Sequence, residues 1–509
     1  MADPDIVFMR GSDAFSWYME RDPVLRSTIV AVAWLDTAPD WEVLQRRMAA
    51  AVEQVPLFRT RPVTPPARLA TPRWTLDPEF DLDWHLRRVA APPPRGPETV
   101  LAMAEKAATT AFDPARPLWE FTLVEGLETG GTAFLMKLHH ALTDGIGGMQ
   151  LALLLFDRSA AGSMGGPRPM GFPEPPAYPV GDTRRGAALA ASSIGHDLRL
   201  VLDVTRQGGR VVPELGHLVR HPVSTTVSIL ETLASAARIV APVRRTLSPV
   251  MTERGLGRRL GMLDVRLDDL RGAAAAVGGT VNDAFVASVT GGLRRYHEAM
   301  GATVEELRVT MPVSLRKPDD PVAGDRITLM RFAVPVGLAD PAERVRATGA
   351  RCRVACSERA IPYSNLIAGT LNLLPQGAVG AMLKCVDFLA SDVPGLAFPV
   401  YLAGARVTGY YPYSPTIGAA LNTTLLTYDG TCCVGVTMDR DAVDDPGLMV
   451  DCLRQGFDEV LSLQPGSRPA HIGPGQAPRA ASGAGTTRGR VPSGAAAPRT
   501  QSTSPARSS

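Results

Sequence analysis

Two adjacent histidines, His139 and His140, are followed at close spacing by Asp144 and Gly145. An imidazole has a pKa of about 6.5, so its neutral form is available near neutral pH. Such an imidazole can take the proton of an alcohol or amine as that group attacks an acyl carbon, and general-base help of this kind contributes roughly 10²–10⁴-fold. The chemistry that this spacing indicates is proton abstraction by one histidine. A bare histidine pair could equally be structural.

The residues around the pair predict a strand, a turn and a helix. Residues 132–138 form a short apolar run broken by one lysine, which is typical of a strand with at least one buried face. Alternation along that strand sends His139 and His140 to opposite faces. From Gly145 onward the apolar residues take a helical spacing. Asp144 is therefore expected at the helix start, where a carboxylate can cap free amides and meet the positive end of the helix dipole.

Composition narrows the class of protein. The chain has 509 residues, enough for two or more domains, and a hydrophobic fraction of 45%, which is ordinary for a globular protein. A net charge of +2 does not indicate a nucleic-acid partner. With no apolar run of about 18 residues and no signal peptide at the start, we expect a cytoplasmic protein without a transmembrane helix. The six cysteines form no zinc or disulfide framework, and we expect no metal.

The pattern divides the chain into four parts. Residues 1–160 predict an α/β unit, and residues 161–183, rich in Gly and Pro, predict a linker or crossover loop. Residues 184–465 predict a helical segment broken by prolines and then a second α/β unit, in which Asp429 and Gly430 predict a hairpin turn. Residues 466–509 contain no acidic residue and predict disorder. The expected strands are residues 27–34, 121–124 and 307–316, and the expected helices are residues 41–55, 98–110 and 284–300.

Four features, in this order along the chain, resemble the bacterial wax ester synthase/diacylglycerol acyltransferase family. The HHxxxDG motif alone resembles a wider superfamily of CoA-dependent acyltransferases and peptide-synthetase condensation domains. The four together are specific, and the resemblance covers nearly everything except the tail. The features are Pro117-Leu118-Trp119, His139 to Gly145, Asn282-Asp283 at a helix start, and Ser391 to Gly395 followed by Tyr401 to Gly404.

This resemblance implies an α/β fold of two chloramphenicol-acetyltransferase-like domains with mixed sheets and an active-site channel between them. It implies transfer of a fatty acyl group from acyl-CoA, as co-substrate, to diacylglycerol or a long-chain alcohol, with no cofactor. Peripheral contact with the inner membrane face or a lipid-body surface is compatible with it. By position, His140 is the expected general base. His139 would support the fold and Gly145 the motif.

The remaining matched residues have two readings each. Pro117, Leu118 and Trp119 could form a wall of the acyl channel, or they could be ordinary packing. Asn282 could hydrogen-bond the substrate or an oxyanion. Alternatively, Asn282 and Asp283 could stabilise the first turn of the following helix.

Asp144 is expected to hold the loop, paired with an arginine such as Arg316, and to take no part in proton transfer. Two positions depart from the family pattern, because Asp325 and Asp392 stand where the family commonly has asparagine. Each change loses a hydrogen-bond donor and adds a charge. Two alternatives therefore stay open. One is a condensation-type enzyme that forms amides from carrier-bound acyl groups, and the other is a non-catalytic lipid-binding protein.

Overall fold

The computed structural model divides into two units, residues 1–475 and residues 476–509. The residues that the structure describes all belong to the first unit, and they are 6–66, 71–143, 145–161, 178–179, 193–197, 243, 245–314, 327–357, 380 and 383–474. Several predicted features lie outside these residues: most of the predicted linker, most of the predicted helical segment, and Asp144, Arg316 and Asp325.

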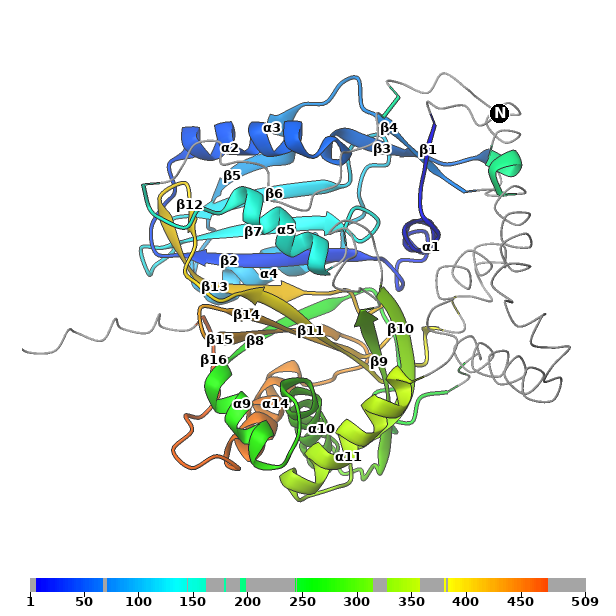
Figure 1. Cartoon of the computed structure of the whole chain (residues 1–509), viewed down its shortest axis with the longest axis vertical. Coiled ribbons are helices and arrows are strands. Elements are labelled where there is room, and N and C mark those ends of the chain that lie inside the picture. The colour runs from blue at the N-terminus through cyan, green and yellow to red at the C-terminus, as the bar shows by residue number, and fades with distance from the viewer. Residues whose placement is uncertain are drawn as a thin grey trace, which may run out of the picture. The chain divides into compact units, whose positions relative to one another are not determined.

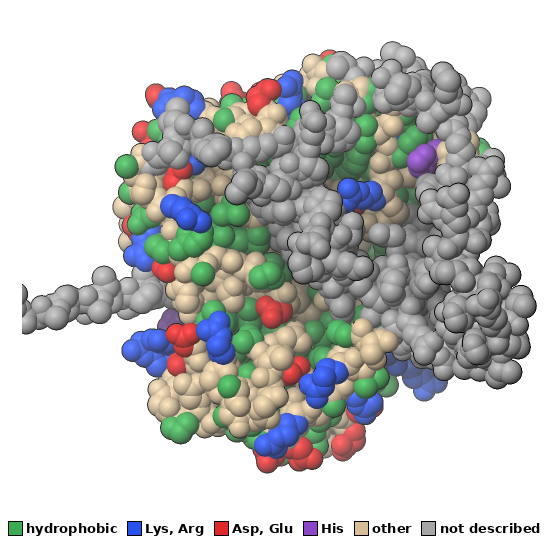
Figure 2. Space-filling view, viewed as in Figure 1, with side chains coloured by type: hydrophobic (Ala, Val, Ile, Leu, Met, Phe, Trp, Pro, Cys, Tyr) green, Lys and Arg blue, Asp and Glu red, His purple; other side chains and the backbone are tan. Residues whose placement is uncertain are grey.

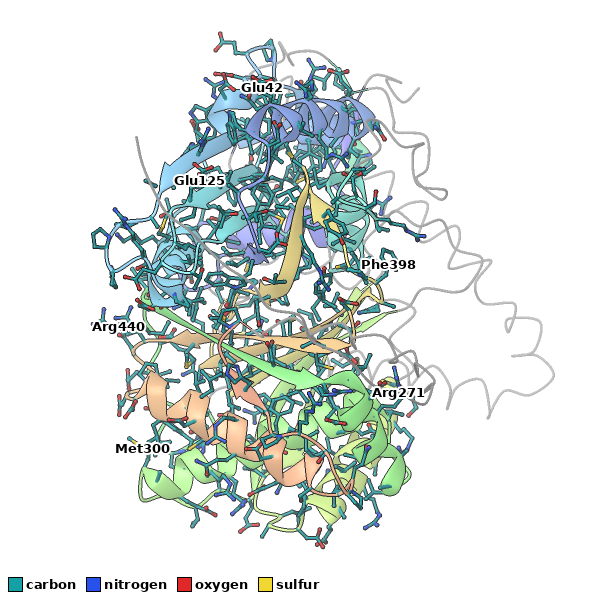
Figure 3. All side chains as sticks on the ribbon, turned by 90° about the vertical axis from the view of Figure 1, so that its left-hand side faces the viewer. Glu42, Glu125, Arg271, Met300, Phe398 and Arg440 are labelled. Carbon is teal, nitrogen blue, oxygen red and sulfur yellow. The ribbon has the colours of Figure 1, made fainter. Side chains whose placement is uncertain are left out.

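The first sheet carries the histidine motif (Figure 1). It has six strands in the order β12-β13-β2-β7-β6-β5, and it is mixed because β5 and β6 are parallel while the other pairs are antiparallel. Figures 1 and 3 place helices α4 and α5 on opposite sides of this sheet. The strands are β2 (Thr28–Leu35), β5 (Leu86–Ala90), β6 (Trp119–Glu125), β7 (Thr132–His139), β12 (Tyr401–Leu402) and β13 (Ala405–Tyr413), and the helices are α2 (Trp41–Gln54), α4 (Pro97–Thr109) and α5 (Gly145–Leu155).

The second sheet has seven strands in the order β10-β9-β11-β14-β15-β8-β16. Four helices cover the face of this sheet that is turned away from the first sheet (Figure 1). The strands are β8 (Arg258–Arg266), β9 (Glu306–Ser314), β10 (Ile327–Pro335), β11 (Phe388–Leu396), β14 (Leu421–Tyr428), β15 (Thr431–Asp439) and β16 (His471–Ile472). The helices are α9 (Leu267–Ala276), α10 (Val281–Ala299), α11 (Pro341–Cys356) and α14 (Pro446–Leu461).

A small three-stranded sheet and three short helices complete the described part of the N-terminal half. They are β1 (Val7–Phe8), β3 (Thr60–Val63) and β4 (Arg73–Leu76), with α1 (Gly11–Met19), the 3-10 helix η1 (Pro56–Arg59) and α3 (Leu82–His85).

Local sequence explains most of these elements. The strand predicted before the histidines is β7, and all eight of its residues are buried, so both of its faces are covered. The hairpin between β14 and β15 turns at Asp429 and Gly430, whose φ angles of 45° and 79° are those that a two-residue hairpin turn requires. Helix α10 begins with a capping box in which Thr280 and Asp283 bond each other's backbone.

Two predicted domain boundaries need correction. Strands β12 and β13 come from the half of the chain assigned to the second domain, yet they extend the first sheet, where β13 pairs with β2. The segment predicted to be disordered from residue 466 continues the fold through residue 474, because β16 pairs with β8. Both pairings join residues far apart in sequence, which local composition does not reveal.

The two sheets share a hydrophobic core. The cluster built on the first sheet also contains Leu260, Met262 and Cys433 from the second. Glu105 of α4 bridges the halves as well, because its carboxylate accepts hydrogen bonds from the Leu260 amide (3.0 Å) and the Arg259 guanidinium (2.8 Å). The motif at the end of β7 is therefore fixed to a scaffold drawn from both halves.

Candidate active site

The two histidines leave the end of β7 in different surroundings, as alternation along the strand predicts. His139 is wholly buried, whereas His140 is half-buried. The His140 amide donates a hydrogen bond to Ser27 O (2.9 Å), which ties the start of the turn to the residue before β2. The His140 imidazole makes no hydrogen bond to a described residue. Because the residue is half-buried, the ring is partly open to solvent.

The imidazole of His139 is held on both sides. The Ala141 amide donates to Nδ1 (3.0 Å), and Nε2 lies 3.2 Å from Glu20 Oε2. Because an amide can only donate, Nδ1 carries the lone pair and the ring proton lies on Nε2, where it is donated to Glu20. The rings of Trp17 and Phe112 meet the imidazole edge-on, at centroid distances of 5.5 and 6.0 Å.

The Pro117-Leu118-Trp119 segment packs behind the motif. All three residues are buried. Leu118 O accepts the His139 amide (3.0 Å), and its side chain shares a small cluster with Ala141. Trp119 donates from Nε1 to Phe58 O (2.9 Å). Of the two readings of this segment, these contacts favour packing and support of the histidine turn.

A second histidine environment lies behind Trp119. His85 is wholly buried, stacks on Trp119 with centroids 4.6 Å apart, and donates from Nδ1 to Trp119 O (2.6 Å). Burial lowers its pKa, so the ring is neutral near pH 7. These contacts give His85 a structural role in the core.

A buried lysine lies on β7 beside the motif. Lys137 is 3.2 Å from Glu120 Oε1, and its Nζ lies 4.2 Å from the centroid of the Phe112 ring. Removal from water lowers the pKa of Lys137, and the Glu120 carboxylate opposes this shift. Lys137 thus adds a positive charge to the core beneath His139.

Asn282 and Asp283 are not brought to the histidines. They lie in the first turn of α10, on the helix-covered face of the second sheet, whereas β7 belongs to the first sheet (Figure 1). The Asp283 carboxylate accepts the Thr280 amide (2.9 Å), completing the helix cap. Asp283 therefore stabilises the first turn of α10, which is the second of the two roles considered for it. No contact of Asn282 in the described residues supports a role for it in binding an oxyanion.

The other predicted residues divide into those described and those outside. Gly145 is the first residue of α5, as predicted. Asp392, on β11, has an exposed side chain and no ion pair with a described residue. The protein around Asp392 nevertheless displaces part of the bulk water, and this desolvation raises the pKa of the carboxyl.

Within the described ranges, no three His, Cys, Asp or Glu side chains form a cluster that could hold a metal ion.

Glu20 is the site residue that sequence reasoning missed. It lies 119 residues before its partner His139, directly after α1. Nothing in the residues around Glu20 distinguishes it from a surface glutamate. The contact arises only when the end of α1 meets the end of β7.

Comparison with known proteins places these features in a family. The wax ester synthase/diacylglycerol acyltransferase catalytic domain matches residues 9–285, and the C-terminal domain of the same family matches residues 323–460. A Mycobacterium tuberculosis (strain H37Rv) protein named as a diacylglycerol O-acyltransferase is 36% identical over 476 residues, covering 91% of this chain and 95% of its own. Another from strain CDC 1551 is 30% identical over 424 residues, covering 78% and 85%.

Solved structures share the fold. The wax ester synthase/diacylglycerol acyltransferase from Marinobacter aquaeolei VT8 superposes with a TM-score of 0.60 at 22% identity, covering 90% of this chain and all of that one. The first condensation domain of the calcium-dependent antibiotic synthetase gives a TM-score of 0.57 at 15% identity, covering 90% and 96%. The two-domain acyltransferase fold expected from the motifs is therefore present.

Proposed function

Because this chain belongs to the wax ester synthase/diacylglycerol acyltransferase family and is an acyltransferase, we propose that it transfers a long-chain fatty acyl group from acyl-CoA to the hydroxyl of diacylglycerol or of a long-chain alcohol. The observation that carries the proposal is the pair at the end of β7. The imidazole of His139 is buried and hydrogen-bonded at both ring nitrogens, whereas His140 is half-buried and its ring makes no hydrogen bond to a described residue.

In this mechanism His140 is the general base. Its neutral imidazole takes the proton of the acceptor hydroxyl, and the oxygen attacks the thioester carbonyl carbon. The tetrahedral intermediate collapses with cleavage of the carbon–sulfur bond, and the imidazolium returns the proton to the departing CoA thiolate. General-base help of this kind contributes roughly 10²–10⁴-fold to the rate. The transfer is direct, so the reaction needs acyl-CoA as co-substrate and no cofactor.

The roles of the residues around His140 follow from this scheme. His139 fixes the strand end through its bonds to the Ala141 amide and Glu20. Asp144 and Arg316 lie outside the described residues, and for them we propose the role expected from the sequence, in which Asp144 holds the loop with an arginine such as Arg316 as its partner. Pro117, Leu118 and Trp119 support the turn from behind and form no part of the acyl channel.

The test is release of free CoA thiol from palmitoyl-CoA by the purified chain, with diacylglycerol and hexadecanol offered separately. We expect acceptor-dependent release that falls by at least about 10²-fold in His140→Ala. A Thr143→Ala variant is the neighbouring control. Equal release from wild type and His140→Ala would remove His140 as the base. Release only with a carrier-bound acyl group and an amine would favour the amide-forming alternative.

Because both substrates are lipids, we propose that the chain meets them at a membrane or lipid-body surface without crossing it. In the part of the chain that the structure describes, no helix is both long enough and apolar enough to cross a bilayer. Over the described residues of the face in Figure 2, basic and acidic side chains are interspersed. On the described part of this face, apolar contact therefore accounts for binding better than attraction to anionic lipids. The test is flotation of the chain with neutral vesicles at low and high salt. Binding that does not change with salt would support apolar contact. Loss of binding at about 0.5 M salt, where surface charges are largely screened, would contradict it.

A further inference from the structure

We propose that Glu20 is the positioning residue of this active site: its carboxylate holds the imidazole of His139, and through it the turn that carries His140. This inference rests on the proposed function, because it deepens the role of the same site.

One oxygen of Glu20 joins three segments. Glu20 Oε2 accepts hydrogen bonds from His139 Nε2 (3.2 Å) and from the Ser27 amide (3.3 Å). Ser27 O in turn accepts the His140 amide (2.9 Å). The carboxylate therefore contacts the end of β7 through His139 and the start of β2 through Ser27. Both contacts lead within one residue to the backbone of His140.

The helix that precedes Glu20 does not explain its charge. Glu20 is the C-cap residue of α1, and that helix has no basic residue in its last turn. A carboxylate is disfavoured at a helix C-terminus, because the dipole there is negative. The glutamate side chain is also only 11% exposed. A negative charge at such a place is costly unless it binds donors. The donors that it binds are His139 Nε2 in the histidine turn and the Ser27 amide, whose residue accepts the His140 amide.

Two cations partly balance this carboxylate without replacing its partners. Arg26 Nε lies 3.5 Å from Glu20 Oε1, and the same guanidinium donates to Thr109 O at the end of α4. The buried ammonium of Lys137 lies close enough for Glu20 to favour its charged form. The carboxylate therefore lies between two basic side chains while Oε2 accepts the hydrogen bond from His139 Nε2.

The consequence for catalysis is geometric. Without the carboxylate, the buried His139 Nε2–H loses its acceptor, and a buried unpaired donor destabilises the ring orientation that also accepts the Ala141 amide. The turn between His139 and Ala141 would relax, and His140 lies at its centre. A displacement of about 1 Å at a catalytic group can cost on the order of 10²-fold in rate. Substrate binding by the rest of the fold would be unaffected.

The experiment measures kcat and KM for palmitoyl-CoA with hexadecanol in Glu20→Leu, His139→Gln and the double variant. Leucine is used because glutamine would keep a carbonyl oxygen that can accept the bond from His139 Nε2. We expect kcat to fall on the order of 10²-fold in Glu20→Leu at unchanged KM. We expect the double variant to be no worse than the poorer single variant, because both changes break one contact. Glu20→Asp keeps the charge on a shorter stem and should recover part of kcat. An unchanged kcat in Glu20→Leu, or fold-losses that multiply in the double variant, would overturn the proposal.

Two further measurements isolate the role of Glu20. Glu125→Leu is the matched control. Glu125 (labelled in Figure 3) also lies on the first sheet, but it is away from the motif, and its Oε2 pairs with Arg88 Nε at a distance of 2.6 Å. It should leave kcat unchanged. Carbethoxylation by diethyl pyrocarbonate, mapped by peptide mass spectrometry, needs no turnover. We expect His139 to be protected in the wild type and reactive in Glu20→Leu. Equal protection would overturn the positioning role, even if the wild type proved inactive with these substrates and the proposed function failed.

Discussion

Tyr411 of β13 donates a hydrogen bond from its hydroxyl to the carboxylate of Asp264 on β8, with an O–O distance of 2.6 Å. Both residues are buried. The bond therefore links the first sheet to the second inside their shared core, through a strand that crosses from the C-terminal half of the chain. It ties the position of the crossing strand to that of the second sheet.

Tyr411→Phe is expected to lower the free energy of unfolding by about 1.5–3 kcal/mol, because it removes a hydrogen bond to a buried charged group. Urea unfolding followed by circular dichroism measures the change. Tyr401→Phe, on the partly exposed strand β12, is the control and should change stability by less than about 0.5 kcal/mol. A Tyr411→Phe variant as stable as the wild type would show that the two sheets do not depend on this bond.

Trp119 separates packing from substrate contact. Trp119→Phe keeps most of the ring but loses the bond to Phe58 O. We expect it to lower stability by about 1–3 kcal/mol while leaving KM for palmitoyl-CoA unchanged. Comparing acyl-CoA chain lengths in the same variant tests the channel-wall alternative. A shift in the preferred acyl length, at unchanged stability, would restore Trp119 to the acyl channel.

The elements that local sequence predicts are those that local physics determines. The strand before His139, the cap at Thr280 and the turn at Asp429 each follow from residues within a few positions. Contacts between distant segments cannot be predicted from neighbouring residues in this way. The pairing of β13 with β2 joins residues more than 370 positions apart, as in the 3.3 Å bond from Thr408 to Trp34 O. The contact of Glu20 with His139 is of the same kind, so the motif predicts the base while its support emerges only from the fold.

Two glycines let α10 and α14 approach closely. A Cβ on Gly456 would lie 2.3 Å from the Gly292 nitrogen and 2.3 Å from Ser288 O, both backbone atoms of α10 that cannot move aside. Gly456→Ala should therefore force the helices apart and cost about 1–3 kcal/mol or more in stability. Gly447→Ala, on the same helix, meets only the Asp445 carboxylate oxygen at 3.4 Å and should be neutral or slightly stabilising. Thermal unfolding of both variants measures the difference, and equal melting temperatures would contradict the close packing.

His297 makes stability depend on pH. The ring is wholly buried and donates from Nδ1 to Leu293 O (2.7 Å). Nε2 lies 2.8 Å from Ser248 Oγ. That oxygen already accepts the Val250 amide (3.3 Å) and the Met251 amide (2.9 Å), which occupy both of its lone pairs, so the hydroxyl donates its own proton to the ring. If Nε2 carried a proton, the ring N–H and the Ser248 O–H would point at each other as two donors. Burial and this arrangement keep the imidazole neutral, and burial lowers its pKa below the value of about 6.5 that holds in the unfolded chain.

The sign of the effect follows from linkage. Below about pH 6.5 the unfolded chain binds a proton at His297 that the folded chain refuses until its lower pKa is reached. The stabilising contribution is thus complete above about pH 6.5 and is lost as pH falls toward the folded pKa, at no more than about 1.4 kcal/mol per pH unit. In His297→Gln the free energy of unfolding should therefore fall less between about pH 7 and pH 5 than in the wild type. His471→Gln, at an exposed position, should keep the wild-type slope. Parallel pH profiles for wild type and His297→Gln would show that this histidine is protonated as readily in the folded chain as in the unfolded one.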